Sequence, residues 1–318
     1  MAALSPIEVI YVLIALAGVL AILAPLNGVL VRFRVNYSGR KSLQLHELDS
    51  NGTAAPRPSP IVKTYYDMFR RVDRLEGVAG LFKGSMPTVI QILGVTILVA
   101  LFVDPRKSRW LKARAPIAEI LISLLYTSIM LIATLPIRVI SNRAIITPMK
   151  LGYLNPGHAL RVLLTATELK RPWTIYFTPG LLAAEALHSM TIVFILGPLR
   201  RGLLPQFSKA CASFDGVSAG NIALYTVSTL FITAIITPLE VIATRLSVQR
   251  NGVDAEYSSI QQNVDGPGRE EVVGLRDKGD PYLGFADCAK RIIHEEGVMT
   301  LYRGWWLTFL WNWGTTFI

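Results

Sequence analysis

Long apolar runs separated by short polar segments are the main pattern of this chain. Four runs contain no charged residue and are 18 to 24 residues long: Val9–Val31, Gly84–Val103, Ile120–Ile137 and Gly216–Leu239. A helix of that length crosses a hydrocarbon core of about 30 Å. Two further runs, Ala186–Leu199 and Gly304–Ile318, are shorter. We count all six as membrane spans, because the two short runs occupy places where a repeated unit requires a span.

Three of the apolar runs end in the same short pattern, a proline followed seven residues later by an arginine. The clearest copy is TPLEVIATR at Thr237–Arg245, and weaker copies are LPIRVISNR at Leu135–Arg143 and APLNGVLVR at Ala24–Arg32. The copies lie roughly a hundred residues apart, which predicts three tandem units. We place the units at 1–112, 113–212 and 213–318, with the middle one degenerate and the last one short at its C-terminal end.

A proline at membrane depth removes a backbone hydrogen bond, so each of these helices is expected to be kinked or broken there. The expected kinks lie at Pro25, Pro136 and Pro238, and the repeated arginines are Arg32, Arg143 and Arg245.

A second pattern follows two segments whose apolar residues recur at helical spacing. EGVAGLFKG comes after Thr64–Leu75, and EGVMTLYRG comes after Phe285–His294. The spacing predicts amphipathic helices lying along the membrane surface. In the middle unit, His158–Leu169 takes the place of the surface helix, and the glycine motif is eroded to TELKRPWTIYFTPG. The polar segments Gly39–Pro60 and Arg250–Pro281 are expected to be loops, the second of them flexible.

Composition supports a membrane protein over the alternative of a large soluble helical protein. Hydrophobic residues make up 52% of the chain, and the mean hydropathy is +0.43. The net charge of +10 is spread between the spans without a nucleic-acid recognition motif, so contact with lipid phosphates explains it better. The N-terminus lacks the basic stretch of a signal peptide, and we expect the first apolar run to be the first span.

No cofactor and no metal site are predicted. The two cysteines, Cys211 and Cys288, form no disulfide framework, and the four histidines lack metal-ligand spacing. The spans also contain no visible cluster of nucleophile and base, so an enzyme is not expected.

The proline motifs and glycine motifs resemble those of the mitochondrial carrier family. The family repeat carries P-x-[DE]-x-x-[KR]-x-[KR], and after a surface helix an acid and glycine followed by an aromatic residue, a base and glycine. The resemblance covers essentially the whole chain. It implies an all-α membrane protein with six transmembrane helices in three pseudo-symmetric repeats around a central cavity, each repeat with a short matrix-side amphipathic helix. It also implies both termini on the intermembrane-space side and alternating-access transport of a small solute across the mitochondrial inner membrane.

The chain departs from the family at the matrix gate. In the family, the acid of each proline motif pairs with a base of a neighbouring repeat. Here the acid positions hold Asn27, Arg138 and Glu240, and the base positions hold Leu30, Ser141 and Ala243. None of the three family pairs can form. Because an isolated charge at membrane depth is costly, we predict that Arg138 pairs with Glu240. The alternative is that Arg138 faces water in the cavity.

Family positions for substrate contact carry over to Gln91, Leu187, His188, Trp311 and Asn312. None is a lysine or arginine, which disfavours a strongly anionic substrate. Gln91, His188 and Asn312 are candidates for a neutral hydrogen-bonding site, and Trp311 for stacking on a flat or cationic group. Alternatively, the amides bond a neighbouring helix and the tryptophan anchors the membrane interface. Glu185 is either a solvated helix cap or a site residue.

Two functions remain open at this stage. The first is a solute carrier of the mitochondrial inner membrane, and the second is a carrier-fold adaptor without transport, for example at the outer membrane. Loss of the gate pairs favours the adaptor, whereas the retained prolines, arginines and polar cavity positions favour the carrier. We take transport as the expectation. The expected partners are the lipid bilayer, with cardiolipin at the matrix-side helices as a candidate lipid, and a small solute, without nucleic acid.

Overall fold

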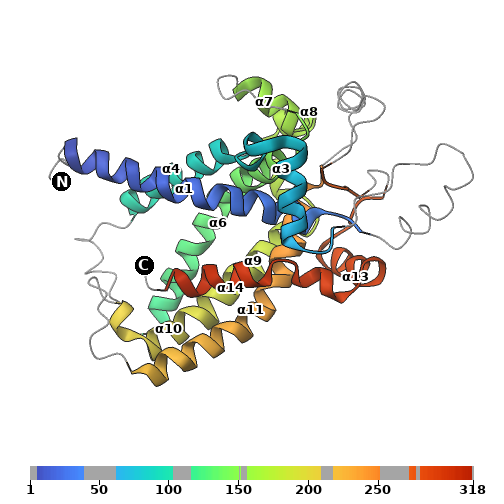
Figure 1. The fold of residues 1–318 in the computed structure, drawn as a ribbon. Coiled ribbons are helices and arrows are strands. Elements are labelled where there is room, and N and C mark those ends of the chain that lie inside the picture. The colour runs from blue at the N-terminus through green and yellow to red at the C-terminus, as the bar shows by residue number, and fades with distance from the viewer. Residues whose placement is uncertain are drawn as a thin grey trace, which may run out of the picture.

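The computed structural model describes residues 6–38, 62–102, 116–149, 151, 156–208, 218–250, 272–276 and 280–316, and within these ranges every regular element is helical. The expected loop at 39–60 lies outside these residues, as does most of the segment 250–281. Six helices occupy the places of the predicted spans: α1 (Pro6–Val35), α4 (Ser85–Phe102), α6 (Pro116–Ile146), α9 (Leu181–Thr191) with its continuation α10 (Gly197–Leu203), α11 (Ala219–Val248) and α14 (Trp305–Gly314) (Figure 1).

These helices make the chain an all-α membrane protein. Four of them, α1, α6, α9 with α10, and α11, are by themselves long and apolar enough to cross a membrane. Helix α4 meets this condition together with the preceding helix α3 (Tyr65–Leu81), to which it is joined through a bend of 49°. Helix α14 has 10 residues in the described part of the chain, which is less than a full span.

The predicted prolines lie inside helices that continue past them. Pro25, Pro136 and Pro238 fall within α1, α6 and α11, so the helices are not broken there. Nearby side chains supply hydrogen bonds of their own: just before Pro238, the hydroxyl of Thr237 donates to the carbonyl of Thr233 at 2.8 Å.

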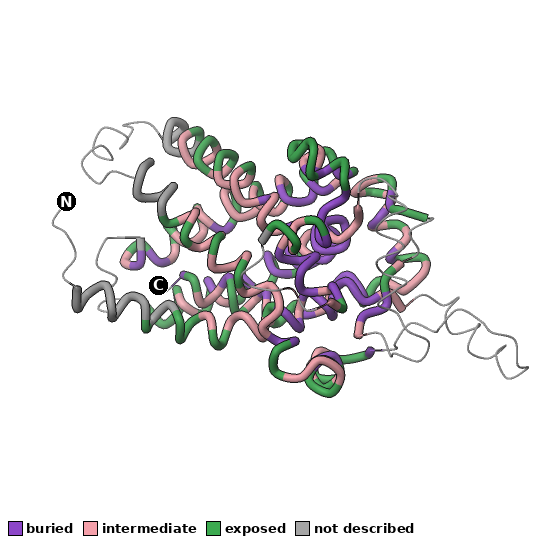
Figure 2. The backbone as a smooth tube through the Cα atoms, turned by 90° about the horizontal axis from the view of Figure 1, so that it is seen from above, coloured by how far each residue is buried: buried purple, intermediate pink, exposed green. Residues whose placement is uncertain are grey.

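The buried residues gather at one end of the bundle, seen as the purple region of Figure 2. This end carries the three repeated arginines and the surface helices α3 and α13 (Phe285–Glu295), and we call it the motif end. The helix starts at Pro6 and Ala219 lie at the opposite end (Figure 1). Along the helices, large apolar side chains such as Leu125 and Phe231 are exposed, at 64% and 71%, as expected for positions that face lipid.

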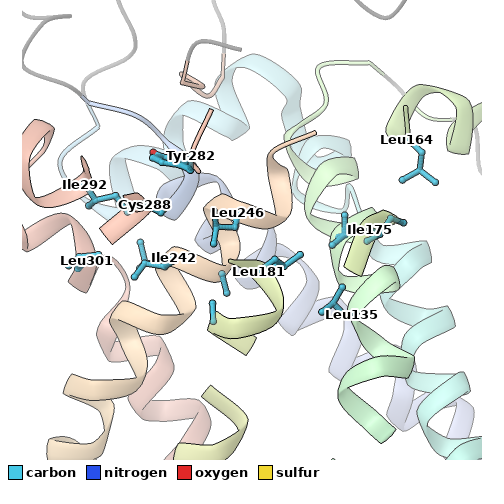
Figure 3. Packing of buried hydrophobic residues seen from close by; sticks show 14 residues of the cluster. Leu135, Leu164, Ile175, Leu181, Ile242, Leu246, Tyr282, Cys288, Ile292 and Leu301 are labelled. Atoms are coloured by element: carbon cyan, nitrogen blue, oxygen red, sulfur yellow. The ribbon is translucent and has the colours of Figure 1, made fainter. Parts of the chain in front are cut away.

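The largest apolar cluster joins the second and third predicted units at the motif end. Ile242 and Leu246 of α11 form its centre, and residues of α6, α9 and α13 pack around them (Figure 3). The other labelled members are Leu135, Leu164, Ile175, Leu181, Tyr282, Cys288, Ile292 and Leu301.

The predicted surface helices are present. Helix α3 begins at a capping box in which Thr64 and Asp67 satisfy each other's backbone amides, and it buries Met68 and Val72 against α1. Helix α13 buries Cys288 in the same manner. The middle unit has two short helices in this place, α7 (Pro156–Leu163) and α8 (Ala166–Lys170).

The two copies of the glycine motif have the same backbone shape. The glycines after the acid, Gly77 and Gly297, have φ of 67° and 96°, and the closing glycines, Gly84 and Gly304, have φ of 80° and 72°. These left-handed conformations favour glycine. A side chain at Gly84 would press on Ile145 of α6, and one at Gly304 would overlap Leu30 of α1. Gly84 and Gly304 therefore allow the backbone of each glycine motif to lie close to a long helix of another unit, α6 and α1 respectively.

Candidate functional site

Each repeated arginine is buried and forms an ion pair with an acid further along its own predicted unit. The pairs, with Nη–Oε distances of 2.6, 2.6 and 2.9 Å, are Arg32–Glu76, Arg143–Glu168 and Arg245–Glu296. The arginine side chains are at most 2% exposed. Because a buried charge needs a partner, each pair fixes a long helix to the surface segment that follows it. The repeated spacing marks these arginines in the sequence, but it does not reveal their partners.

The basic residues of the two glycine motifs, Lys83 and Arg303, each donate a hydrogen bond to a residue of another predicted unit. Lys83 Nζ donates to the carbonyl of Thr147, just after α6, at 3.0 Å. Arg303 donates to the carbonyl of Phe33 in α1 at 3.2 Å. Burial and the nearby charge of Arg245 lower the pKa of Arg303 to about 10, so Arg303 stays protonated at neutral pH.

A layer of polar side chains crosses the bundle beside these pairs. Its members, which we call the polar layer, are Arg34, Arg138, Glu185, His188, Glu240 and Thr308. Arg34 Nη2 lies 2.7 Å from Glu240 Oε2. Thr308 Oγ1 donates to that same oxygen at 2.5 Å, and His188 Nε2 lies 3.5 Å from Glu240 Oε1. Glu240 therefore links α11 to α1, α14 and α9.

The predicted pair between Arg138 and Glu240 is wrong. Arg138 Nη1 instead donates to both carboxylate oxygens of Glu185, at 2.7 and 2.6 Å. Glu185 is 3% exposed and is an ion-pair partner of Arg138, not a solvated cap. Helix α6 packs against both α9 and α11, but the carboxylate that reaches Arg138 is that of Glu185 on α9, while Arg34 of α1 pairs with Glu240. Arg34 lies four residues, about one helical turn, beyond Leu30.

The remaining gate positions have other surroundings. Leu30 contacts the backbone at Gly304, and Ala243 is buried in the largest apolar cluster. The hydroxyl of Ser141 lies 3.4 Å from Thr88 Oγ1, and Asn27 is exposed. An ion pair between α1 and α11 is thus kept at this end, with Arg34 as the base in place of Leu30.

A cavity of about 210 Å³ lies between α6 and α9, beside the polar layer. Arg138, Glu185 and His188 line it, and most of the remaining wall is apolar, including Leu131 and Ile192. The Arg138 side chain is 43% exposed, whereas that of Glu185 is 4% exposed. The ion pair therefore presents its cationic partner to the open space while its carboxylate stays covered.

Comparisons with known proteins agree with this architecture. A family model described as "Mitochondrial carrier protein" matches residues 218–318. The chain is also similar to the chloroplastic nicotinamide adenine dinucleotide transporter 1 of Arabidopsis thaliana, with 24% identity over 300 residues that cover 91% of this chain and 81% of the relative. The last third of the chain thus matches the carrier family, and the similarity to a transporter extends over nearly the whole chain. The described helices are those of a multi-pass membrane protein.

The five predicted contact residues are spread over three helices. His188 lines the cavity, and Gln91 is half-buried on α4. Leu187 and Trp311 are 43% and 57% exposed. Asn312 is 7% exposed, and its Nδ2 has no hydrogen-bond acceptor among the described residues. Their contact with a solute stays a prediction, for which His188 is the best placed.

The arrangement can orient a small polar solute. A guanidinium, an imidazole and a covered carboxylate face one small cavity, and such groups orient a polar solute inside an apolar wall. The ion pair of Arg34 with Glu240, to which His188 of the cavity wall also lies close, joins α1 to α11. The cavity is therefore adjacent to contacts that join α1 to α11 at the motif end.

Proposed function

We propose that this protein moves a small solute of low net charge across the mitochondrial inner membrane by alternating access. The observation that carries the proposal is the charge-balanced polar layer beside the cavity. Arg34 is matched by Glu240, and Arg138 is matched by Glu185. A polyanion would meet no surplus cation among these four groups, whereas phosphate groups are commonly bound by arginine or lysine side chains.

Alternating access is supported by the position of the contacts at the motif end. The pair of Arg34 with Glu240 and the packing of Leu30 against Gly304 both join the first unit to the third. Packing of Ile145 and of the Ser141 backbone against Gly84 joins the second unit to the first. Three tandem repeats at 1–112, 113–212 and 213–318 are part of the proposal, since the closing glycines of the first and third units each lie against a long helix of another unit. Passage of a solute through this end requires the units to separate there.

The test is uptake and exchange by purified protein in liposomes. The panel spans neutral, zwitterionic, cationic and anionic solutes, and it includes NAD because the plant relative is named as an NAD transporter. We expect movement of a solute with low net charge, and a rise in unfolding temperature when that solute is added. Transport of strongly anionic solutes alone would contradict the proposal that the solute has a low net charge. If no solute moves and none shifts the unfolding temperature, the transport proposal fails and the adaptor explanation gains.

Glu185→Gln is expected to reduce transport at least tenfold with little loss of fold. The substitution keeps the side-chain size but leaves the charge of Arg138, which is 43% exposed to the cavity, without its carboxylate. The double variant Arg138→Gln/Glu185→Gln restores charge balance and is expected to transport better than Glu185→Gln. Initial uptake rates check this, with Met190→Leu as the control, because Met190 is 47% exposed on the same helix. Equal uptake rates for Glu185→Gln and the parent would show that the ion pair of Arg138 with Glu185 is not part of the solute site.

A further inference from the structure

Five residues of the last polar insertion, Val272–Arg276, lie packed on the motif end, and we call them the strap. Its main chain is bonded to the end of α1: the amide of Tyr37 donates to the carbonyl of Gly274 at 2.8 Å, and the amide of Gly274 donates to Asn36 Oδ1 at 3.0 Å. Arg71 of α3 donates to the carbonyl of Val272 at 3.2 Å. The strap belongs to the third predicted unit, yet these bonds attach it to the first.

The side chains of the strap enter the apolar clusters of the motif end. Val273 is 8% exposed and shares a cluster with Val31 of α1 and Ile145 of α6. Val272 packs on that cluster and on the one between α1 and α3. This corrects the expectation that the whole insertion is flexible. The apolar pair gives these residues something to bury, which the polar residues around them lack.

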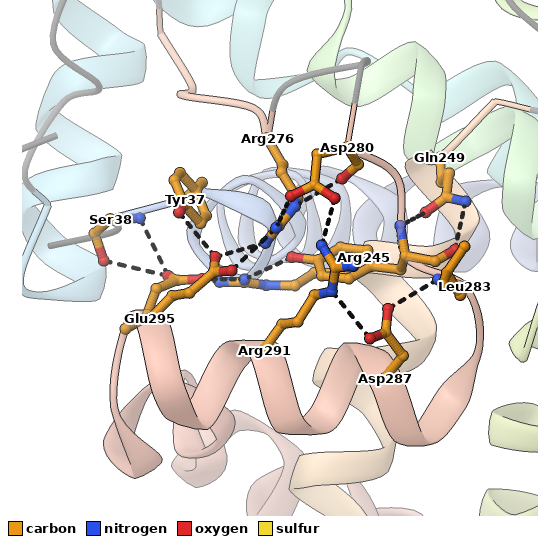
Figure 4. A network of polar contacts seen from close by, with 12 residues as sticks. Tyr37, Ser38, Arg245, Gln249, Arg276, Asp280, Leu283, Asp287, Arg291 and Glu295 are labelled. Atoms are coloured by element: carbon orange, nitrogen blue, oxygen red, sulfur yellow. Dashed lines mark hydrogen bonds and ion pairs between the residues drawn. The ribbon is translucent and has the colours of Figure 1, made fainter. Parts of the chain in front are cut away.

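An ionic contact holds the far end of the strap to its own unit. Arg276 Nη1 lies 2.6 Å from Glu295 Oε2 of α13, as Figure 4 shows. The guanidinium also lies over the rings of Tyr37 and Tyr282, at 5.7 and 4.9 Å from their centroids. Burial alone would raise the pKa of Glu295, but the bonds from Arg276 and Tyr37 outweigh it and lower that pKa. Glu295 therefore remains charged at neutral pH.

We propose that the strap is a latch that holds the motif end closed and releases α1 each time that end opens. The inference rests on the proposed alternating access. Val273 shares one apolar cluster with the ends of α1 and α6, and the backbone of Gly274 is bonded to the end of α1. When these helix ends separate, the strap cannot keep both sets of contacts. The latch thus favours the closed state by the contacts that exist only there.

A reversible tether between the strap and α1 tests the latch. The variant Tyr37→Cys/Leu275→Cys, made in a Cys211→Ser/Cys288→Ala background, is joined with a short bis-methanethiosulfonate reagent and released by reductant. Leu275 is 40% exposed, and it adjoins the bond between Tyr37 and Gly274. We expect the tether to lower solute exchange in liposomes at least tenfold and reductant to restore it. Full exchange by completely tethered protein would show that the strap is a static brace, which overturns the latch.

Controls separate the latch from effects of the reagent or of the substitutions. Each single cysteine variant receives the same treatment. The pair Lys290→Cys/His294→Cys places a tether on the exposed side of α13, where two positions four residues apart keep a fixed distance. This tether is expected to leave exchange within twofold of the parent. A tenfold loss with it would assign the inhibition to the reagent and overturn the latch interpretation.

A second readout does not depend on transport. Val31→Cys is added as a reporter, since Val31 is 5% exposed in the cluster that contains Val273, and its reaction with an impermeant maleimide is followed by mass spectrometry. We expect the tether to slow labelling of residue 31 at least tenfold. If the reduced protein transports no solute, the proposed function fails, and the labelling still decides the latch. Equal labelling with and without the tether overturns it.

Discussion

Arg143→Met is expected to lower the free energy of unfolding by about 3–5 kcal/mol, because it leaves a carboxylate in the protein interior without its counter-charge. The partner, Glu168, is 0% exposed, and Arg143 is 1% exposed. Arg143 also donates to the carbonyls of Ser247 and Gln249, at 3.2 and 2.7 Å. Removing it therefore also loosens the contact between α6 and the end of α11. Unfolding in detergent, followed by tryptophan fluorescence, measures the change.

The double variant Arg143→Met/Glu168→Gln separates the buried charge from the lost packing. Glutamine keeps an oxygen that can accept from the amide of Thr165, so the cap of α8 is retained. We expect the double variant to be more stable than Arg143→Met, since no uncompensated charge remains. Arg161→Met is the control, because Arg161 is exposed on α7, and it is expected to change stability by less than about 0.5 kcal/mol. A double variant as unstable as Arg143→Met would mean that packing, and not charge, dominates.

The helices and the glycine turns can be predicted from the sequence because they depend on local patterns. Apolar runs of membrane length predict α1, α6 and α11, and the spacing of Met68 and Val72 predicts the buried face of α3. The two glycine motifs predict equivalent turns, and the closing glycines Gly84 and Gly304 do share a left-handed backbone conformation. Each of these signals lies within one element or one turn, so no knowledge of the packing is needed to read it.

The ion pairs of the site depend on which side chains the packed helices bring together, and a single sequence does not contain that information. Arg138 and Glu240 occupy corresponding motif positions, which made them plausible partners, yet α9 brings Glu185 closer to Arg138. Arg34 lies outside the motif spacing and acquires its role only because α1 packs on α11. A glutamate at the start of an otherwise apolar run is the signal that could have directed attention to Glu185. For the strap, the signal is the apolar pair Val272–Val273 inside a polar insertion.

Gly180→Ala is expected to destabilise the carrier by about 2–5 kcal/mol, through backbone strain and overpacking together. Gly180 precedes α9 and has φ of +78°, a conformation that side chains disfavour. A Cβ there would overlap the amide nitrogen of Phe285 and lie 2.7 Å from the carbonyl carbon of Gly284. These are main-chain atoms, so no side chain can turn aside, and the starts of α9 and α13 must move apart.

The same displacement would move the polar layer, since α9 carries Glu185 and His188. We therefore expect Gly180→Ala to lower both the unfolding temperature and the transport rate. The matched control is Gly157→Ala: Gly157 lies in α7, where an added Cβ would meet no described atom within 4 Å, and alanine there is expected to stabilise by about 0.4–1 kcal/mol. Unfolding of both variants is measured in the same detergent. A Gly180→Ala protein as stable as the parent would show that α9 and α13 are not in close backbone contact, and that the position of Glu185 does not depend on it.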